Sequence, residues 1–262
     1  MKTHDRLDRL KDIIRDAGKL AVAYSAGVDS TFLLYTAHEV IGDGCLAVTA
    51  RSCLCPRREM DEAEEFCRTR GIRHIVLTPD VFAVEGFAEN PRDRCYICKK
   101  NIFGEICRLA ASEGMRAADG TNADDMGDDR PGMRAAEELG VLSPLRDAGL
   151  TKADIRALSK EAGLGTWDKP SYACLATRIP HGDIITRNKL RLIEEAEYIL
   201  HDMGFRQVRV RLHGNDARIE TERERIAEAA GMAGEICSRL SGLGFGHISL
   251  DLSGYGGQCP AG

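Results

Sequence analysis

The sequence of 262 residues lacks a long apolar run, a run of basic residues and a secretory signal. No apolar stretch approaches the roughly 20 residues that a membrane-spanning helix needs, so no membrane partner is expected. The segment MKTHDRLDRLKD at the N-terminus is charged and amphipathic, so the cytoplasm is the expected location. The formal net charge is -5 and the basic residues are scattered, which argues against a nucleic-acid groove as the main surface.

Cysteine, by contrast, is abundant, with 10 residues in the chain. Structural disulfides are not expected in a reducing compartment, so clustered cysteines are candidates for metal binding or catalysis. Four others fall in apolar helix or strand patterns and are interpreted as small buried hydrophobic residues, namely Cys45, Cys67, Cys107 and Cys237.

The first part of the chain alternates between short apolar strands and amphipathic helices. Strands are predicted at 20–24, 45–48, 75–77 and 115–119, and helices at about 29–40, 56–71, 99–111 and 152–162. This alternation predicts an α/β fold, with a parallel twisted sheet covered by helices on both faces. Ligands of such sheets bind beyond the carboxyl ends of the strands, where 25–30, 49–52 and 119–122 lie.

A turn-rich segment, 166–183, precedes a second pattern of helix, two strands, helix and strand. These elements are predicted at 190–203, 208–211, 217–220, 223–240 and 247–252. We therefore expect one domain at 1–165, a small α+β C-terminal domain at 166–255 and a flexible tail at 256–262.

The segment Ser25-Ala26-Gly27-Val28-Asp29-Ser30 joins the first predicted strand to a helix. Backbone N–H groups at a helix N-terminus form an anion site, and the Ser25 and Ser30 hydroxyls can donate to phosphate oxygens. Gly27 can adopt a positive φ. Asp29 would repel a phosphate without an intervening cation, which suggests Mg²⁺. The usual signature G-x-x-x-x-G-K-S/T is absent, and spacing alone fits equally a plain corner with Asp29 and Ser30 as helix caps.

This segment resembles the PP-loop, S-G-G-x-D-S, of the ATP pyrophosphatases, which include GMP synthetase, asparagine synthetase and the tRNA thiolases. The resemblance implies that ATP adenylates a carbonyl or carboxylate oxygen and that the loop grips the released pyrophosphate. Ala26 replaces a glycine of the family motif, and its methyl group is tolerable if that position has ordinary backbone angles. The nucleotide-binding positions so implied are Ser25, Gly27, Val28, Asp29, Ser30, Ala50, Ser52, Gly120 and Asn122, with Asp29 also catalytic.

Further stretches resemble the LarE-type sulfur transferases, and together they span nearly the whole chain. They are RCYICK at 94–99, GTNADD at 120–125, KPSYACLATRIP at 169–180 and VRVRLHGNDARIE at 208–220. The resemblance implies sulfur insertion into pyridinium-3,5-biscarboxylic acid mononucleotide, a step that builds the nickel-pincer nucleotide cofactor. It also implies a sulfide donor and a homo-oligomer.

The residue types suit that chemistry. A doubly carboxylated, phosphorylated substrate needs cations, and Arg209 and Arg211 alternate onto one face of their predicted strand. Arg178 and Arg218 are further candidates for binding this substrate. Glu220 is a candidate to orient an arginine or to act as a base. A solvated strand face is the alternative interpretation of these charges.

Two sources of sulfur are open in this family. In one, Cys174 attacks the acyl-adenylate, and C–S cleavage leaves dehydroalanine, so the protein works once. In the other, Cys95, Cys98 and Cys174 hold a [4Fe–4S] cluster whose open iron carries an extra sulfide. The Cys95-x-x-Cys98 pair favours the cluster, because Arg94, Lys99 and a helix start all favour thiolates. A redox pair, an incomplete zinc site and coincidence are the alternatives for this pair.

Two other functions compete with sulfur transfer to a small substrate. A tRNA thiolase with a cluster needs a basic RNA-binding surface, which the net charge of -5 argues against. A non-catalytic nucleotide or iron–sulfur carrier would have no function for Arg209, Arg211 and the Cys174 segment. Cys53 and Cys55 are interpreted as incidental, with a second metal pair as the alternative. The sequence thus predicts an ATP-dependent sulfurtransferase without a nucleic-acid partner.

Overall fold

The computed structural model describes residues 2–127, 131–170 and 173–256. The chain divides into two compact units. The first comprises Met1–Phe87 and Arg92–Tyr172, and the second comprises Ala88–Pro91 and Ala173–Gly262. Compact units are not by themselves folding domains, so the boundary at residue 165 stays a prediction. Of the tail predicted at 256–262, residues 257–262 lie outside the described residues.

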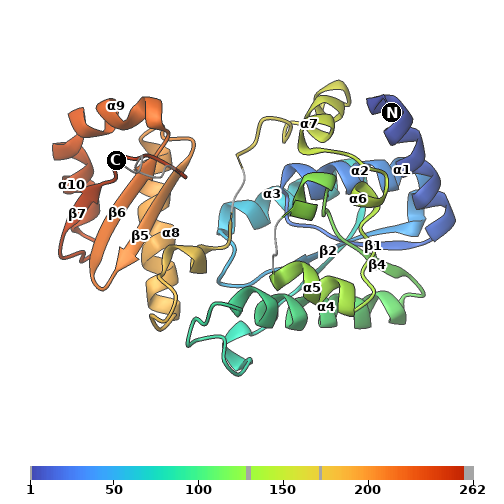
Figure 1. Ribbon diagram of the computed structural model, residues 1–262, viewed down its shortest axis with the longest axis horizontal. Helices are drawn as coiled ribbons and strands as arrows, with labels where there is room; N and C mark the ends of the chain where they lie inside the picture. The colour runs from blue at the N-terminus through green and yellow to red at the C-terminus, as the bar shows by residue number, and fades with distance from the viewer. Residues whose placement is uncertain (1, 128–130, 171–172, 257–262) are drawn as a thin grey trace. The chain divides into compact units, whose positions relative to one another are not determined.

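The first unit is built on a four-stranded parallel sheet with the order β3-β2-β1-β4 (Figure 1). Its strands are β1 Leu20–Ala23, β2 Cys45–Ala50, β3 Arg73–Leu77 and β4 Arg116–Ala118. The predicted parallel α/β fold is confirmed. Because all four strands run the same way, the segments that follow β1, β2 and β4 leave the sheet at one edge.

Helices cover both faces of this sheet (Figure 1). One face carries α1 Thr3–Ala17, α2 Val28–Ile41, α3 Arg57–Arg70, α6 Pro144–Asp147 and α7 Lys152–Glu161, and the other carries α4 Arg94–Ser112 and α5 Pro131–Glu138. The side chains of β1 alternate accordingly, because Leu20 and Val22 pack in the first core and Ala21 packs in the second. The sheet is therefore buried on both faces, as a parallel sheet requires.

The second unit contains a three-stranded sheet with the order β5-β6-β7. Its strands are β5 Val208–His213, β6 Asp216–Thr221 and β7 Ile248–Leu250, with β5 and β6 antiparallel and β6 and β7 parallel. Its helices are α8 Arg187–Asp202, α9 Ile226–Gly231 and α10 Ala233–Ser241. One face of this sheet packs on these helices through apolar residues that include Val208, Val210 and Ile219. The predicted α+β unit is present.

Three local predictions differ from the structure. Helix α4 begins at Arg94 rather than near residue 99, and α5 and α6 were not expected. The helix predicted at 223–240 is broken at Met232, between Gly231 and Gly234, because glycine is a poor helix former. Short 3-10 helices connect the elements at Gly42–Gly44, Val81–Ala83, Ala123–Gly127, Leu175–Arg178 and Arg223–Arg225.

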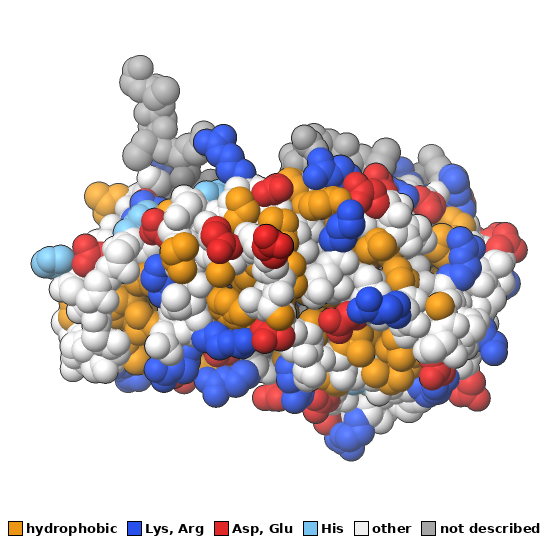
Figure 2. All heavy atoms as spheres, turned by 90° about the horizontal axis from the view of Figure 1, so that it is seen from below, with side chains coloured by type: hydrophobic (Ala, Val, Ile, Leu, Met, Phe, Trp, Pro, Cys, Tyr) orange, Lys and Arg blue, Asp and Glu red, His pale blue; other side chains and the backbone are white. Residues whose placement is uncertain are grey.

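Basic and acidic side chains are interspersed on the face that Figure 2 shows. Within the described residues, no helix combines the length and the apolar character of a membrane span.

Candidate active site

The loop 25–30 joins β1 to α2 at the carboxyl edge of the first sheet. The hydroxyl oxygens of Ser25 and Ser30 lie 3.1 Å apart, and the Ser30 hydroxyl also donates to the Gly27 carbonyl oxygen at 3.2 Å. The N-cap of α2 is Gly27, which supplies no side-chain cap. The alternative of Asp29 and Ser30 as caps is therefore wrong. The first N–H groups of α2 lack a side-chain cap, as an anion site requires.

Gly27 does not use the positive φ that was open to it, and Ala26 does not have the ordinary backbone angles on which its fit was made to depend. Gly27 has a φ of -78°, whereas Ala26 has a φ of 55°, in the left-handed region that favours glycine. An L residue in that region is less stable by about 1–2 kcal/mol. The Ala26 methyl group is tolerated because it packs in the core, where the residue is 2% exposed. The loop therefore holds backbone strain at the position where phosphate is expected.

The Asp29 carboxylate has two different environments at its two oxygens. Oδ2 accepts a hydrogen bond of 2.5 Å from Nζ of Lys152, which opens α7. Oδ1 is buried and has no hydrogen-bond partner within the described residues. Burial raises the pKa of Asp29, and Lys152 opposes that change. An unpartnered carboxylate oxygen is a ligand that Mg²⁺ prefers, so Asp29 fits the predicted ion.

Sequence reasoning missed Lys152. Its partner lies 123 residues away in the chain, and a lysine at the start of a helix carries no local signal of such a pairing. The fold brings the two together because α2 and α7 pack in the same core.

The segment after β4 packs against the loop through Gly120. A Cβ atom on Gly120 would lie 2.9 Å from the Ser30 nitrogen, closer than real contacts allow. Only glycine therefore permits this approach to the first turn of α2. Asn122 is buried, and its Oδ1 accepts a hydrogen bond of 2.9 Å from the Asp124 nitrogen. In the structure Asn122 thus stabilises a local turn, and its contact with a nucleotide stays a prediction.

The third predicted nucleotide segment follows β2. Ala50 ends that strand, and the Ser52 hydroxyl accepts a hydrogen bond of 3.3 Å from the Leu54 nitrogen. Cys53 and Cys55 stand in the same turn as partly buried thiols. Because β2 is hydrogen-bonded to β1, this segment leaves the sheet beside the loop 25–30.

Cys95 and Cys98 lie near the start of α4, as its second and fifth residues. Their spacing places both thiols on one face of the helix, and both are partly buried. A helix N-terminus favours thiolates, and thiolates are the ligands of iron–sulfur clusters. In the described part of the chain, no three His, Cys, Asp or Glu side chains form a metal site. Cys174 belongs to the second unit, so the set of three cysteines stays a prediction.

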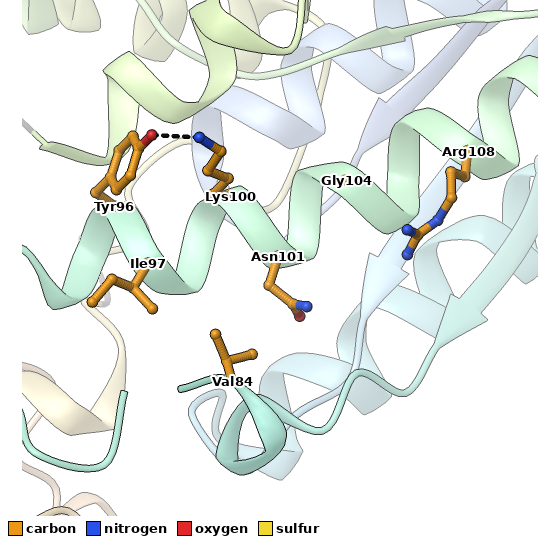
Figure 3. A pocket seen from close by; sticks show the side chains of 7 residues that line it. All are labelled: Val84, Tyr96, Ile97, Lys100, Asn101, Gly104 and Arg108. Atoms are coloured by element: carbon orange, nitrogen blue, oxygen red, sulfur yellow. Dashed lines mark hydrogen bonds between the residues drawn. The ribbon is translucent and has the colours of Figure 1, made fainter. Parts of the chain in front are cut away.

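An open pocket of about 400 Å³ lies along the flank of the same helix (Figure 3). It is lined by Val84, Tyr96, Ile97, Lys100, Asn101, Gly104 and Arg108. Lys100 donates to the Tyr96 hydroxyl at 2.6 Å, and Tyr96 donates to Glu138 at 2.7 Å. No residue predicted for the nucleotide, the substrate or the cluster lines this pocket.

In the second unit, β5 and β6 bring the predicted arginines onto one face. Arg209 pairs in register with Glu220, and Arg211 pairs with Arg218. The apolar residues of both strands point to the opposite face, where they pack on the helices. The four charged side chains therefore lie on the face of the sheet that is opposite this core.

Glu220 lies at the centre of this face and is mostly buried. Arg211 donates to its two oxygens at 2.9 and 3.0 Å, and Arg218 reaches one of them at 3.4 Å. Arg211 also donates to the Thr177 carbonyl oxygen at 2.7 Å. Glu220 thus orients Arg211, which in turn holds the 3-10 helix that follows Cys174.

Arg178 is the most deeply buried of these arginines. It donates to both oxygens of Glu197 on α8, at 2.9 and 3.0 Å. Its Nη1 donates to the carbonyl oxygens of Ala173 and Cys174, at 2.6 and 3.1 Å, and to the Thr177 hydroxyl. In the structure Arg178 therefore fixes the Cys174 backbone, and its predicted contact with substrate stays untested. Sequence reasoning missed Glu197, although a carboxylate on the buried face of a helix signals a partner.

Arg209 is also buried, with 2% of the residue exposed. Its Nη1 donates to the Val208 carbonyl oxygen at 2.9 Å, and its guanidinium lies 5.0 Å from the centre of the Tyr255 ring. This contact with Tyr255 fixes the direction of a planar cation. In the KPSYACLATRIP stretch, residues 171 and 172 lie outside the described residues.

Comparison with known proteins gives three informative relatives, while no family model matches the chain. The chain is 36% identical over 253 residues to an uncharacterised protein of Synechocystis, with 95% of this chain and 94% of that protein covered. It is 34% identical over 244 residues to the pyridinium-3,5-bisthiocarboxylic acid mononucleotide synthase of Lactiplantibacillus plantarum, with 92% and 88% covered. It is 29% identical over 213 residues to one subunit of the glutamine-hydrolysing GMP synthase of Thermoplasma volcanium, with 74% and 67% covered.

The parallel sheet, the loop after β1 and the likeness to GMP synthases define an ATP pyrophosphatase of the PP-loop class. The chain is accordingly an ATP-dependent enzyme. Within that class, the chain belongs to the family of pyridinium-3,5-bisthiocarboxylic acid mononucleotide synthases, the LarE family. The resemblance drawn from the sequence motifs is confirmed.

Proposed function

We propose that the protein is an ATP-dependent sulfur transferase acting on pyridinium-3,5-biscarboxylic acid mononucleotide. It converts a carboxylate of that substrate to a thiocarboxylate, for the nickel-pincer nucleotide cofactor. The observation that carries the proposal is the 34% identity to the named synthase over 92% of this chain. The charged face of β5 and β6 supports it, because a substrate with three anionic groups needs several cations.

The reaction has two steps. In the first, a carboxylate oxygen of the substrate attacks the α-phosphorus of ATP, and the bond to pyrophosphate breaks. The N–H groups of the loop 25–30 bind the departing pyrophosphate. Asp29, whose Oδ1 is unpartnered within the described residues, would hold Mg²⁺, and that ion would neutralise phosphate charge. In the second, sulfide attacks the acyl carbon, and AMP leaves with the electrons of the C–O bond. A proton is released from the sulfide, and the thiocarboxylate remains.

The residues of the second unit hold the substrate. Arg211 and Arg218 are 30% and 42% exposed at their side chains, so their guanidinium groups can meet carboxylate or phosphate oxygens. Glu220 keeps Arg211 oriented, and Arg209 is fixed by Tyr255. Arg178 fixes the Cys174 backbone.

Cys95, Cys98 and Cys174 would hold a [4Fe–4S] cluster, and this cluster would supply the sulfide for the second step after loading by a sulfide donor. The support for this proposal is the donor chemistry, because thiolates at the start of a helix suit iron and sulfide. Protein purified without oxygen is expected to contain iron and acid-labile sulfide, and Cys95→Ala and Cys98→Ala should lose both. Cys237→Ala is the matched control, because the Cys237 thiol on α10 is exposed, and not buried as its sequence pattern indicated. Iron-free protein that loses the mass of H₂S in one turnover would instead show that Cys174 is sacrificed.

The reaction itself is tested by the release of pyrophosphate from ATP. Release is expected to depend on the pyridinium substrate. Release that depends on tRNA, or on neither compound, would contradict the proposal. We also propose a homo-oligomer in the cytoplasm, and size-exclusion chromatography with light scattering tests the oligomer.

A further inference from the structure

Lys169 is a partly buried cation beside the loop 25–30, and its side chain is 13% exposed. Its ammonium group donates to the Ala26 carbonyl oxygen at 3.1 Å. It also donates to Glu59 at 2.8 Å and to Glu62 at 2.6 Å, both on α3. A lysine has three N–H donors, so this geometry uses all of them within the protein.

The contact with Ala26 falls on the strained residue of the loop, whose φ is 55°. A residue with a side chain persists in this region only when its surroundings hold it there. The carbonyl group of Ala26 and the N–H group of Gly27 belong to one planar trans peptide and point in opposite directions. By holding that carbonyl, Lys169 therefore sets the direction of the Gly27 N–H group at the start of α2.

Lys169 is itself held by α7. Arg156 on that helix donates to the carbonyl oxygens of Trp167 and Lys169, at 2.6 and 2.8 Å. The same helix supplies Lys152, which pairs with Asp29. Helix α7 thus supports the loop twice, once at the Asp29 side chain and once, through Lys169, at the Ala26 backbone.

We propose that Lys169 is a positioning residue for nucleotide binding. It holds the peptide between Ala26 and Gly27 in the orientation in which the loop meets the phosphates of ATP. Because its donors are already used, Lys169 acts through the loop and not as a phosphate ligand. The inference rests on the proposed binding of ATP at this loop.

The test measures the binding of Mg–ATP and Mg–pyrophosphate to the full chain by titration calorimetry. Lys169→Met is expected to raise the Kd of both probes at least tenfold. Ala26→Gly in the same chain is expected to restore Kd to within about threefold of wild type, because glycine adopts a positive φ without strain. Lys160→Met is the matched control, because Lys160 lies on α7 over the Trp167 ring and should leave Kd unchanged.

Each other outcome overturns the inference. Lys169→Met with a Kd within twofold of wild type would show that the loop does not need the contact. A raised Kd that Ala26→Gly does not restore would mean that Lys169 binds phosphate directly or acts by charge alone. If Lys169→Met does not fold, the triple variant K169M/E59Q/E62Q, which leaves no unpaired carboxylate at this site, carries the same expectations. Wild-type protein that binds neither probe would overturn the proposed function together with the inference.

Discussion

Replacing Arg178 by methionine is expected to destabilise the protein by about 3–5 kcal/mol, the usual effect of removing one partner of a buried ion pair. The side chains of Arg178 and Glu197 are 0% and 4% exposed. Methionine fills much of the same volume but leaves the Glu197 carboxylate buried without a countercharge. One hydrogen bond of 3.0 Å from the Val210 nitrogen would remain to it, which is too little to offset the burial of a charge.

The assay is urea unfolding at neutral pH, followed by circular dichroism. The double variant R178M/E197M is expected to recover most of the lost stability, because two apolar residues can replace a buried ion pair. It should not recover sulfur transfer, because the bonds from Arg178 to the Cys174 backbone are still missing. Arg191→Met is the control variant. It removes an exposed ion pair with Glu195, also on α8, and should change the free energy of unfolding by less than about 1 kcal/mol.

The reasoning would be refuted if R178M cost less than about 1 kcal/mol, or if the double variant were no more stable than the single one. The first result would mean that the buried pair contributes little to folding. The second would mean that the loss comes from the contacts with Cys174 and Thr177, and not from the unpaired carboxylate of Glu197.

Three further predictions concern the first unit. Gly120→Ala should lower the free energy of unfolding by about 1–3 kcal/mol and weaken ATP binding, because the added Cβ would displace the Ser30 backbone. Thermal melts measure the first effect and calorimetry measures the second. Ala26→Gly should leave the free energy of unfolding within about 1 kcal/mol of wild type, because the entropic cost of glycine and the loss of a buried methyl group offset the relief of strain. Urea unfolding measures the difference. Burial raises the pKa of Asp154, but hydrogen bonds from neighbouring side chains outweigh it and hold the pKa well below its usual range. The stability that Asp154 contributes is therefore present above about pH 4 and is lost as the pH falls further. Asp154→Asn should thus reduce the loss of unfolding free energy below that pH. An equal loss in the variant and in the wild type would contradict this prediction.

Most of the first unit could be predicted because its strands are continuous apolar runs, as in β1 Leu20–Ala23 and β2 Cys45–Ala50. Such runs are typical of strands buried on both faces. Helices α5 and α6 escaped prediction because they are short, with 8 and 4 residues, and because each begins at a proline that also suits a turn. Helix α4 was placed late because its first turn is held by partners elsewhere in the fold, such as Glu138 on α5.

The chemistry of the site was less predictable than its position. The motif predicted the position of the loop 25–30 correctly. It gave no indication that Ala26, and not Gly27, has the positive φ. The partners that hold the loop are Lys152 and Lys169, which are 123 and 143 residues away from the groups they contact. Local sequence identifies which residues carry chemistry, while contacts across the fold decide how each is held.

A comparison of the ion pairs of Arg178 and Arg218, both in the second unit, shows why that difference matters. Arg178 and Glu197 are buried and bound through two bonds, so no anion can compete for this guanidinium without unfolding the core around it. Arg218 is 42% exposed and reaches Glu220 and Asp251 only at 3.4 Å. A substrate carboxylate would replace these long contacts with short bidentate ones, at little cost to the fold. Among the described arginines of this face, we therefore propose Arg218 as the one whose guanidinium is most readily available to a substrate anion, whereas Arg178 is held within the core.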